Sequence, residues 1–155
     1  MIELLIAIAV LVFGFTSLLA LITTAIASNG RNKTGSTGMM LTQAVVEQIN
    51  STLIGAGSAA LTDCAGHNWT IDTATGGADL SGANIDFSQT SPPADYHMDF
   101  AICSGAVQTI YDVRWNVQPL TSGTYLVTVG ARLKGSGHDL KYYALPVNLR
   151  TYVGP

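Results

Sequence analysis

Residues 3–27 read ELLIAIAVLVFGFTSLLALITTAIA, an apolar run whose one charged residue is Glu3 at its start. The next charged residue along the chain is Arg31. As a helix, residues 4–27 would extend about 36 Å at 1.5 Å per residue, enough to cross a hydrocarbon layer roughly 30 Å thick. The run therefore predicts a helix that is buried in a membrane or against other apolar surfaces.

The rest of the 155-residue chain has room for one domain beyond this helix. Charged residues make up 11% of the sequence, and beyond residue 28 it becomes polar and rich in Gly and Thr. The net charge is −3, and the seven Lys and Arg residues are scattered. Nucleic-acid-binding domains concentrate positive charge on one face, so no nucleic-acid partner is indicated.

The apolar run allows three interpretations. A secretory signal peptide would begin with basic residues, which this run lacks, although Ala25-Ile26-Ala27 resembles a cleavage site. A membrane anchor has Arg31 and Lys33 on its C-terminal side, which by the positive-inside rule would leave the domain in the cytoplasm. A short basic leader before Met1, removed during maturation, would reverse that orientation, and we expect one in the precursor. The third interpretation is a helix packed into an assembly, where a carboxylate such as that of Glu3 needs a partner.

Residues 1–11, MIELLIAIAVL, resemble the start of a mature type IV pilin. In that family a dedicated peptidase removes a short basic leader, and a Glu occupies the fifth mature position. The matching residue here is Glu3, so the resemblance implies that two leading residues, usually including an N-methylated Phe, are missing from this sequence. It is close over these residues and extends in character along the whole apolar run.

The resemblance implies a structural subunit of an extracellular type IV pilus. Such a subunit is held in the bacterial inner membrane as a monomer and passes to the pilus assembly machinery. It then joins a helical homopolymer at the cell surface with its apolar helix in the filament core. Glu3 would pair there with the N-terminal amine of a neighbouring subunit, which neutralises the acid and sets the axial register.

Gly14 is the helix-melting candidate. Gly costs about 1 kcal/mol relative to Ala inside a helix, and in pilins the region after a similar Gly is often melted in the filament. The proline common a few residues later is absent here, where Ala20 and Leu21 stand. Close packing of neighbouring helices is the alternative role for Gly14.

Two further functional interpretations remain open. Within the family, the chain fits a minor pilin or a secretion-system pseudopilin; outside it, the chain fits a membrane-anchored binding or sensor domain that never polymerises. A pilus could serve adhesion, twitching motility, DNA uptake or secretion, and the sequence does not choose among them.

The fold class expected from the pattern is α+β, a long N-terminal helix packed on a four-stranded antiparallel sheet. Residues 1–28 form the apolar helix, and residues 29–56 continue it as an amphipathic half with a weak point at the glycines of 30–38. Residues 57–155 form a globular head, in which 57–95 is a connecting loop and 96–155 alternates as a sheet. The apolar rows of that sheet are Tyr96, Met98, Phe100 and Ile102; Tyr111, Val113, Trp115 and Val117; Tyr125, Val127, Val129, Ala131 and Leu133; and Tyr143, Leu145, Val147 and Leu149.

The two cysteines, Cys64 and Cys103, lie in the polar part of the chain. In an oxidising compartment they are expected to form a disulfide across about 39 residues, which in the loop-entropy model stabilises the fold by roughly 3–4 kcal/mol. The alternative is two unpaired thiols in a reducing cytosol.

No motif for catalysis is present in the sequence. Residues 55–58, GAGS, lack the Lys of a phosphate-binding loop, and no Gly-x-Ser-x-Gly elbow occurs. His67, His97 and His138 are interpreted as surface residues, because the sequence offers too few ligands around them for zinc or haem. The sequence therefore predicts no enzyme, no cofactor and no metal site.

Overall fold

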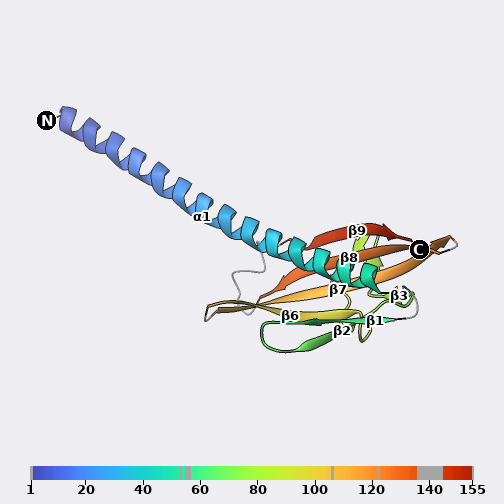
Figure 1. Cartoon of the computed structure of the whole chain (residues 1–155). Coiled ribbons are helices and arrows are strands. Elements are labelled where there is room, and N and C mark those ends of the chain that lie inside the picture. Colours follow the sequence, from blue (N-terminus) through green and yellow to red (C-terminus); the bar gives the residue numbers. More distant parts are fainter. Residues whose placement is uncertain are drawn as a thin grey trace. The chain divides into compact units, whose positions relative to one another are not determined.

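The computed structural model describes residues 2–52, 54, 57–105, 107–121, 123–135 and 145–154. Its contacts divide the chain into two compact units, Met1–Lys33 and Thr34–Pro155. Helix α1 (Ile2–Ser51) contributes to both units and is followed in sequence by the strands of the second unit (Figure 1).

Helix α1 is continuous from Ile2 to Ser51, including the glycine-containing region 30–38 where we expected a weak point. Proline is absent from this range, so every position can keep its helical hydrogen bond. At Gly38 the missing side chain has a packing role, because a Cβ there would lie 3.4 Å from Val147 Cγ2 and 3.9 Å from Ala131 Cβ. Gly14 is helical as well, so melting around it in a filament stays a prediction.

The main sheet is an antiparallel meander of β6 (His97–Ser104), β7 (Val107–Thr121), β8 (Thr124–Lys134) and β9 (Val147–Val153). In register, Phe100 lies opposite Tyr111, and Trp115 lies opposite Val129. A fifth strand, β3 (Gly76–Gly77), pairs with β7 beyond the end of β6. The predicted four-stranded sheet is confirmed, with this short addition.

The core of the second unit lies between the second half of α1 and one face of the sheet, which confirms the α+β class. The helix residues in this core are Leu41, Val45, Val46 and Ile49, and the sheet residues include Met98, Val113, Trp115, Val117, Val127 and Val129. Burying an aliphatic side chain of this size contributes about 1.5–3 kcal/mol. The three apolar rows predicted for β6, β7 and β8 face this core.

The fourth predicted row is only partly correct. Val147 and Leu149 are half-buried in β9, but Leu145 precedes the strand and is 86% exposed. Tyr143 lies outside the described residues. The alternating sequence pattern therefore begins before the first residue of β9 and predicted too long a strand.

The prediction of a connecting loop over residues 57–95 is wrong in part, because five short strands lie there. β1 (Ser58–Thr62) and β2 (Asn68–Asp72) form a hairpin, and β4 (Leu80–Ser81) pairs with β5 (Asn84–Ile85). Apart from the hairpin these strands have two residues each, too short for any alternation to show in the sequence. Contacts far along the chain fix them instead: the Ala78 amide donates to the Trp115 carbonyl.

Gly77 is the position where this added strand tolerates no side chain. It has a φ of +124°, and a Cβ there would overlap the Trp115 carbonyl oxygen and lie 2.8 Å from Tyr96 Cδ1. Backbone strain and overpacking together should make Gly77→Ala destabilising by about 2–4 kcal/mol. Gly76 is the matched control, since its φ is +128° but a Cβ would meet nothing within 4 Å. Urea unfolding of the two variants should separate them, and equal losses would contradict the close approach.

Candidate functional site

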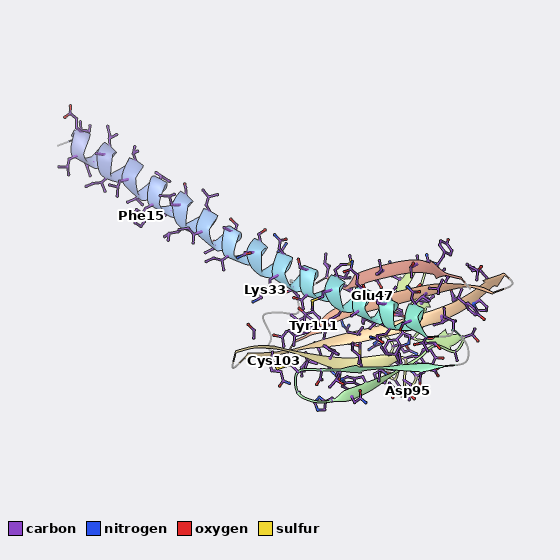
Figure 2. All side chains as sticks on the ribbon, in the orientation of Figure 1. Phe15, Lys33, Glu47, Asp95, Cys103 and Tyr111 are labelled. Carbon is purple, nitrogen blue, oxygen red and sulfur yellow. A yellow bond between two sulfur atoms is a disulfide. The ribbon has the colours of Figure 1, made fainter. Side chains whose placement is uncertain are left out.

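The first unit presents apolar side chains on all sides of its helix. The large hydrophobic residues between Ile2 and Ile26 are all 51–75% exposed, including Phe13 at 75% and Phe15 at 63%. Figure 2 shows the side chains along this part of α1, with Phe15 labelled. An 18-residue window of α1 has a mean hydropathy of 2.8, and the helix is long and apolar enough to cross a membrane. An apolar surface of this extent does not persist in water, so this segment requires a membrane or other apolar surfaces around it.

Four hydroxyl side chains of this segment donate hydrogen bonds inside the helix. Thr16 and Ser17 donate to the Phe13 carbonyl at 3.0 and 2.7 Å, and Thr23 and Thr24 donate to the Ala20 carbonyl at 2.9 and 3.2 Å. Such bonds remove the cost of burying a hydroxyl without a partner. These four hydroxyl groups therefore do not prevent immersion of the run in an apolar environment.

Glu3 lies in the first turn of α1, where its negative charge is favoured by the helix dipole. Within the described chain its carboxylate has no hydrogen bond or ion pair. Further along the same unit, a Cβ at Gly14 would meet nothing within 4 Å. The structure thus places Glu3 and Gly14 on one exposed apolar helix without giving either a contact beyond it.

The expected disulfide is present in the second unit, where Cys64 after β1 is bonded to Cys103 in β6. Beside it lies Asp63, which the sequence interpretation missed. The Asp63 side chain is buried, and its carboxylate accepts hydrogen bonds from the amides of Ala65, His67 and Ala101 and from the Trp69 indole. This carboxylate joins the disulfide loop to the outer edge of β6.

The environment of Asp63 acts on its pKa in two directions. Burial by itself raises the pKa, but the hydrogen bonds from His67, Trp69 and the Ala101 amide outweigh it and hold the pKa well below its usual range. A carboxylate whose pKa is lower in the folded state stabilises the fold above its unfolded pKa of about 3.9, and this contribution is lost as the pH falls below that value.

We expect Asp63→Asn to lower the free energy of unfolding at neutral pH by about 1–3 kcal/mol, because donors to the carboxylate lose their partner. The variant should also lose less stability than the natural chain when the pH falls from 5 to 3, a window that brackets roughly the unfolded pKa. Urea unfolding at both pH values measures the two effects. An identical fall in the free energy of unfolding of both proteins between these pH values would contradict the lowered pKa of Asp63.

The histidines are distributed as follows. His67 is 63% exposed at its side chain, with Nδ1 3.0 Å from Asp63 Oδ2, and His97 in β6 has Nδ1 2.9 Å from the Pro93 carbonyl. His138 lies outside the described residues. In the part of the chain that the structure describes, no three His, Cys, Asp or Glu side chains gather in a way that would hold a metal ion.

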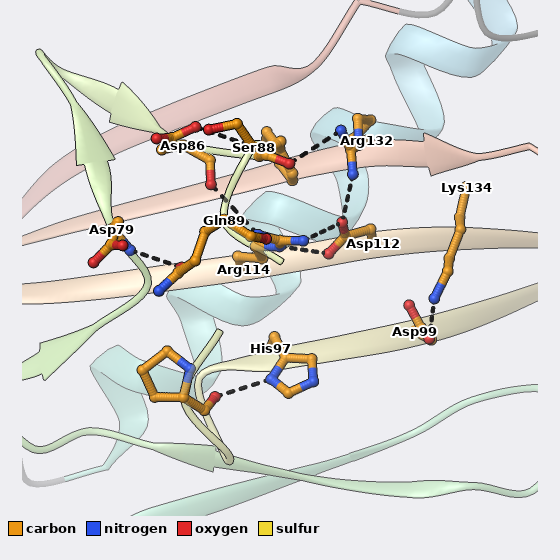
Figure 3. A network of polar contacts seen from close by, with 12 residues as sticks. Asp79, Asp86, Ser88, Gln89, His97, Asp99, Asp112, Arg114, Arg132 and Lys134 are labelled. Carbon is orange, nitrogen blue, oxygen red and sulfur yellow. Dashed lines mark hydrogen bonds and ion pairs between the residues drawn. The ribbon is translucent and has the colours of Figure 1, made fainter. Parts of the chain in front are cut away.

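A second feature missed from the sequence lies on the face of the sheet opposite α1. Asp112 and Arg114 alternate with the core residues of β7 and would be expected in solvent, yet they are only 5% and 6% exposed. Arg114 donates two bonds to Asp112, from Nε at 2.8 Å and Nη2 at 2.9 Å, and Arg132 Nη2 donates a third at 3.0 Å (Figure 3). Residues 85–89 cover this cluster, since Arg114 also donates to the Gln89 carbonyl at 2.8 Å.

Phe87 completes the cluster. The guanidinium carbons of Arg132 and Arg114 lie 4.8 and 5.3 Å from the centre of its ring, within the range of cation–π attraction. The Asp112 carboxylate and the Phe87 ring therefore hold both guanidinium groups in place. Phe87 belongs to the segment 57–95, for which the sequence predicted a connecting loop and no such contacts.

Comparison of the chain with protein-family models, with curated proteins and with solved structures found no match. The apolar first unit is the feature of this chain that an isolated soluble domain does not need.

Proposed function

We propose that this protein is a structural subunit of an extracellular helical filament of the type IV pilus kind. Its first unit would lie in the bacterial inner membrane before assembly and in the filament core afterwards. The second unit would form the outer surface of the filament. Two features support the proposal: the Ile-Glu-Leu-Leu-Ile sequence around Glu3 and the exposed apolar surface of α1.

The observation that carries the proposal is the apolar circumference of residues 2–28. An amphipathic helix docks one stripe on its own domain, whereas here every side is apolar and exposed. A bundle of identical helices would cover all sides at once. Apolar burial at about 25 cal/mol per Å² would then drive association once subunits leave the bilayer.

Glu3 supports the filament over a simple anchor. An acid close to the apolar layer is costly unless it is paired, and residues 4–30 contain no cation that could reach it along the helix. A cation from a neighbouring subunit, the terminal amine in the resemblance stated above, would neutralise Glu3 only in the correct axial register. Glu3 would thus be the residue that specifies assembly.

The test is negative-stain microscopy of material sheared from the native source, with mass spectrometry to identify the chain in it. The proposal expects thin regular filaments in which this chain is the main component. A filament in which it is a trace component would make it a minor pilin. If the chain stays in the membrane fraction and no filament contains it, the membrane-anchored binding or sensor domain replaces the proposal.

A further inference from the structure

A polar groove of about 390 Å³ opens on the sheet face opposite α1, next to the Asp112 cluster. It is lined by β6, β7, β8 and the segment that contains Phe87 and Pro92. Three cations line it, Arg114, Arg132 and Lys134, together with the acids Asp99 and Asp112. The filament proposal does not use this groove, and the inference below does not depend on that proposal.

The groove is less negative than the domain around it. Residues 34–155 contain nine Asp or Glu and five Lys or Arg residues, so the domain is acidic. Three of these five cations converge on the groove, against two acids. The Asp86 carboxylate also acts electrostatically on Arg114, so the groove is close to neutral. A nearly neutral polar concavity in an acidic domain repels an anion less than the rest of the surface does.

Two of the three cations are partly exposed and can reach a ligand in the groove. Arg114 is buried and its guanidinium serves Asp112 and the loop carbonyls. Arg132 and Lys134 have side chains that are 39% and 55% exposed, and they lie two residues apart on one face of β8, roughly 7 Å along the strand.

Arg132 is held in position by contacts that use only part of its N–H donors. Its guanidinium donates to Asp112 at 3.0 Å and to the Phe87 carbonyl at 3.4 Å, and it lies over the Phe87 ring. Of the five N–H donors of an arginine, these bonds use two among the described residues. Lys134 donates one bond, to Asp99 at 2.5 Å, of the three that an ammonium group can make.

We propose that Arg132 and Lys134 form a binding site for the carboxylate of a small soluble acid. The carboxylate would accept from the Arg132 guanidinium on one side and from the Lys134 ammonium on the other. Ser88 and Thr90 line the groove with exposed hydroxyl side chains, which suit further polar groups on the ligand.

The charge of the groove selects a monoanion. Asp99 and Asp112 lie directly opposite each other in the register of β6 and β7, and such like-charge pairs repel unless cations separate them. The three cations neutralise this pair and the nearby Asp86, so each negative charge on a ligand adds to a nearly neutral groove, and a single carboxylate adds the least. A dianion would bring the repulsion back, so a phosphate monoester is disfavoured.

The test uses the full chain in detergent micelles, with ¹⁵N-labelled amide and arginine side-chain signals followed during titration. The probes are acetate, glucuronate and, as the uncharged counterpart, glucose. We expect saturable shifts at Arg132 and Lys134 with both acids and none with glucose. Added salt should weaken the binding because the site is partly exposed.

Variants separate this site from general electrostatics. Arg132→Gln and Lys134→Gln should each weaken carboxylate binding by about tenfold or more, because each removes a charged donor. Arg150→Gln removes an exposed cation from β9 outside the groove. This control should change the affinity for the carboxylate less than about twofold. If Arg132→Gln disturbs the fold, Lys134→Gln carries the test, since Lys134 is the more exposed of the two.

Three results would overturn the inference: no saturable shift with either acid, equal affinity in the Lys134→Gln and Arg150→Gln proteins, or shifts with glucose at the same residues. A dilution series without added ligand distinguishes a soluble acid from a carboxylate of a second copy of this chain. Groove signals that move on dilution would assign the occupant to a second copy of this chain and replace the soluble acid.

Discussion

Replacing Glu3 by Ala should leave the chain inserted in the membrane but reduce filament yield at least about tenfold, because each subunit would leave a neighbour's buried cation unpaired. Insertion depends on the apolar run, which the substitution lengthens. In the proposed filament, assembly would depend on the pair of Glu3 with a neighbour's cation, and removing one partner of a buried ion pair costs about 3–5 kcal/mol. The two effects are separable by comparing membrane-fraction and sheared-filament amounts of the chain.

The matched control is Glu47→Ala. Glu47 is the other Glu of the chain, exposed on the same helix within the second unit. Its removal subtracts the same charge without touching the apolar run, so filament yield should stay unchanged. Normal yield from the Glu3→Ala chain, or an equal loss from both variants, would remove Glu3 from the assembly role.

Asp112→Ala should destabilise the second unit by about 3–5 kcal/mol, because it leaves the buried Arg114 guanidinium without a carboxylate. Two bonds from Arg114 and one from Arg132 would be lost together. The measurement is the free energy of unfolding in urea, followed by the fluorescence of Trp115, which is fully buried in the same strand.

Asp99→Ala is the control for that substitution. Asp99 lies opposite Asp112 in the register, but its ion pair with Lys134 is exposed and should contribute less than about 1 kcal/mol. A double variant, Asp112→Ala with Arg114→Leu, should recover part of the loss because no buried charge remains. Similar stabilities for the Asp112→Ala and Asp99→Ala proteins would show that the buried cluster is not a stabilising feature.

The long-range features of the fold could be predicted where a regular period runs over many residues. The alternating rows of β6, β7 and β8 are of this kind, the continuous apolar run of α1 is as long and as uniform, and both predictions are confirmed. The disulfide between Cys64 and Cys103 could be expected because the chain has two cysteines and no metal-binding spacing.

The features that were missed arise from contacts between distant residues. Asp112 and Arg114 have the alternation of an exposed face, and only the loop around Phe87 buries them. β3 has two glycines and no pattern, and its pairing depends on the space beside Trp115. Asp63 is one acid in a polar stretch until Ala101, 38 residues further on, donates to it. No local period records any of these contacts.

Electron cryomicroscopy of filaments from the native source tests the central claim most directly, because it locates residues 2–28 within the assembly. The account predicts that these helices pack against one another along the filament axis, with Glu3 buried beside a cation of a neighbouring subunit. Filaments in which this helix lies outside the core, or a chain found solely as a monomer in the membrane, would contradict it.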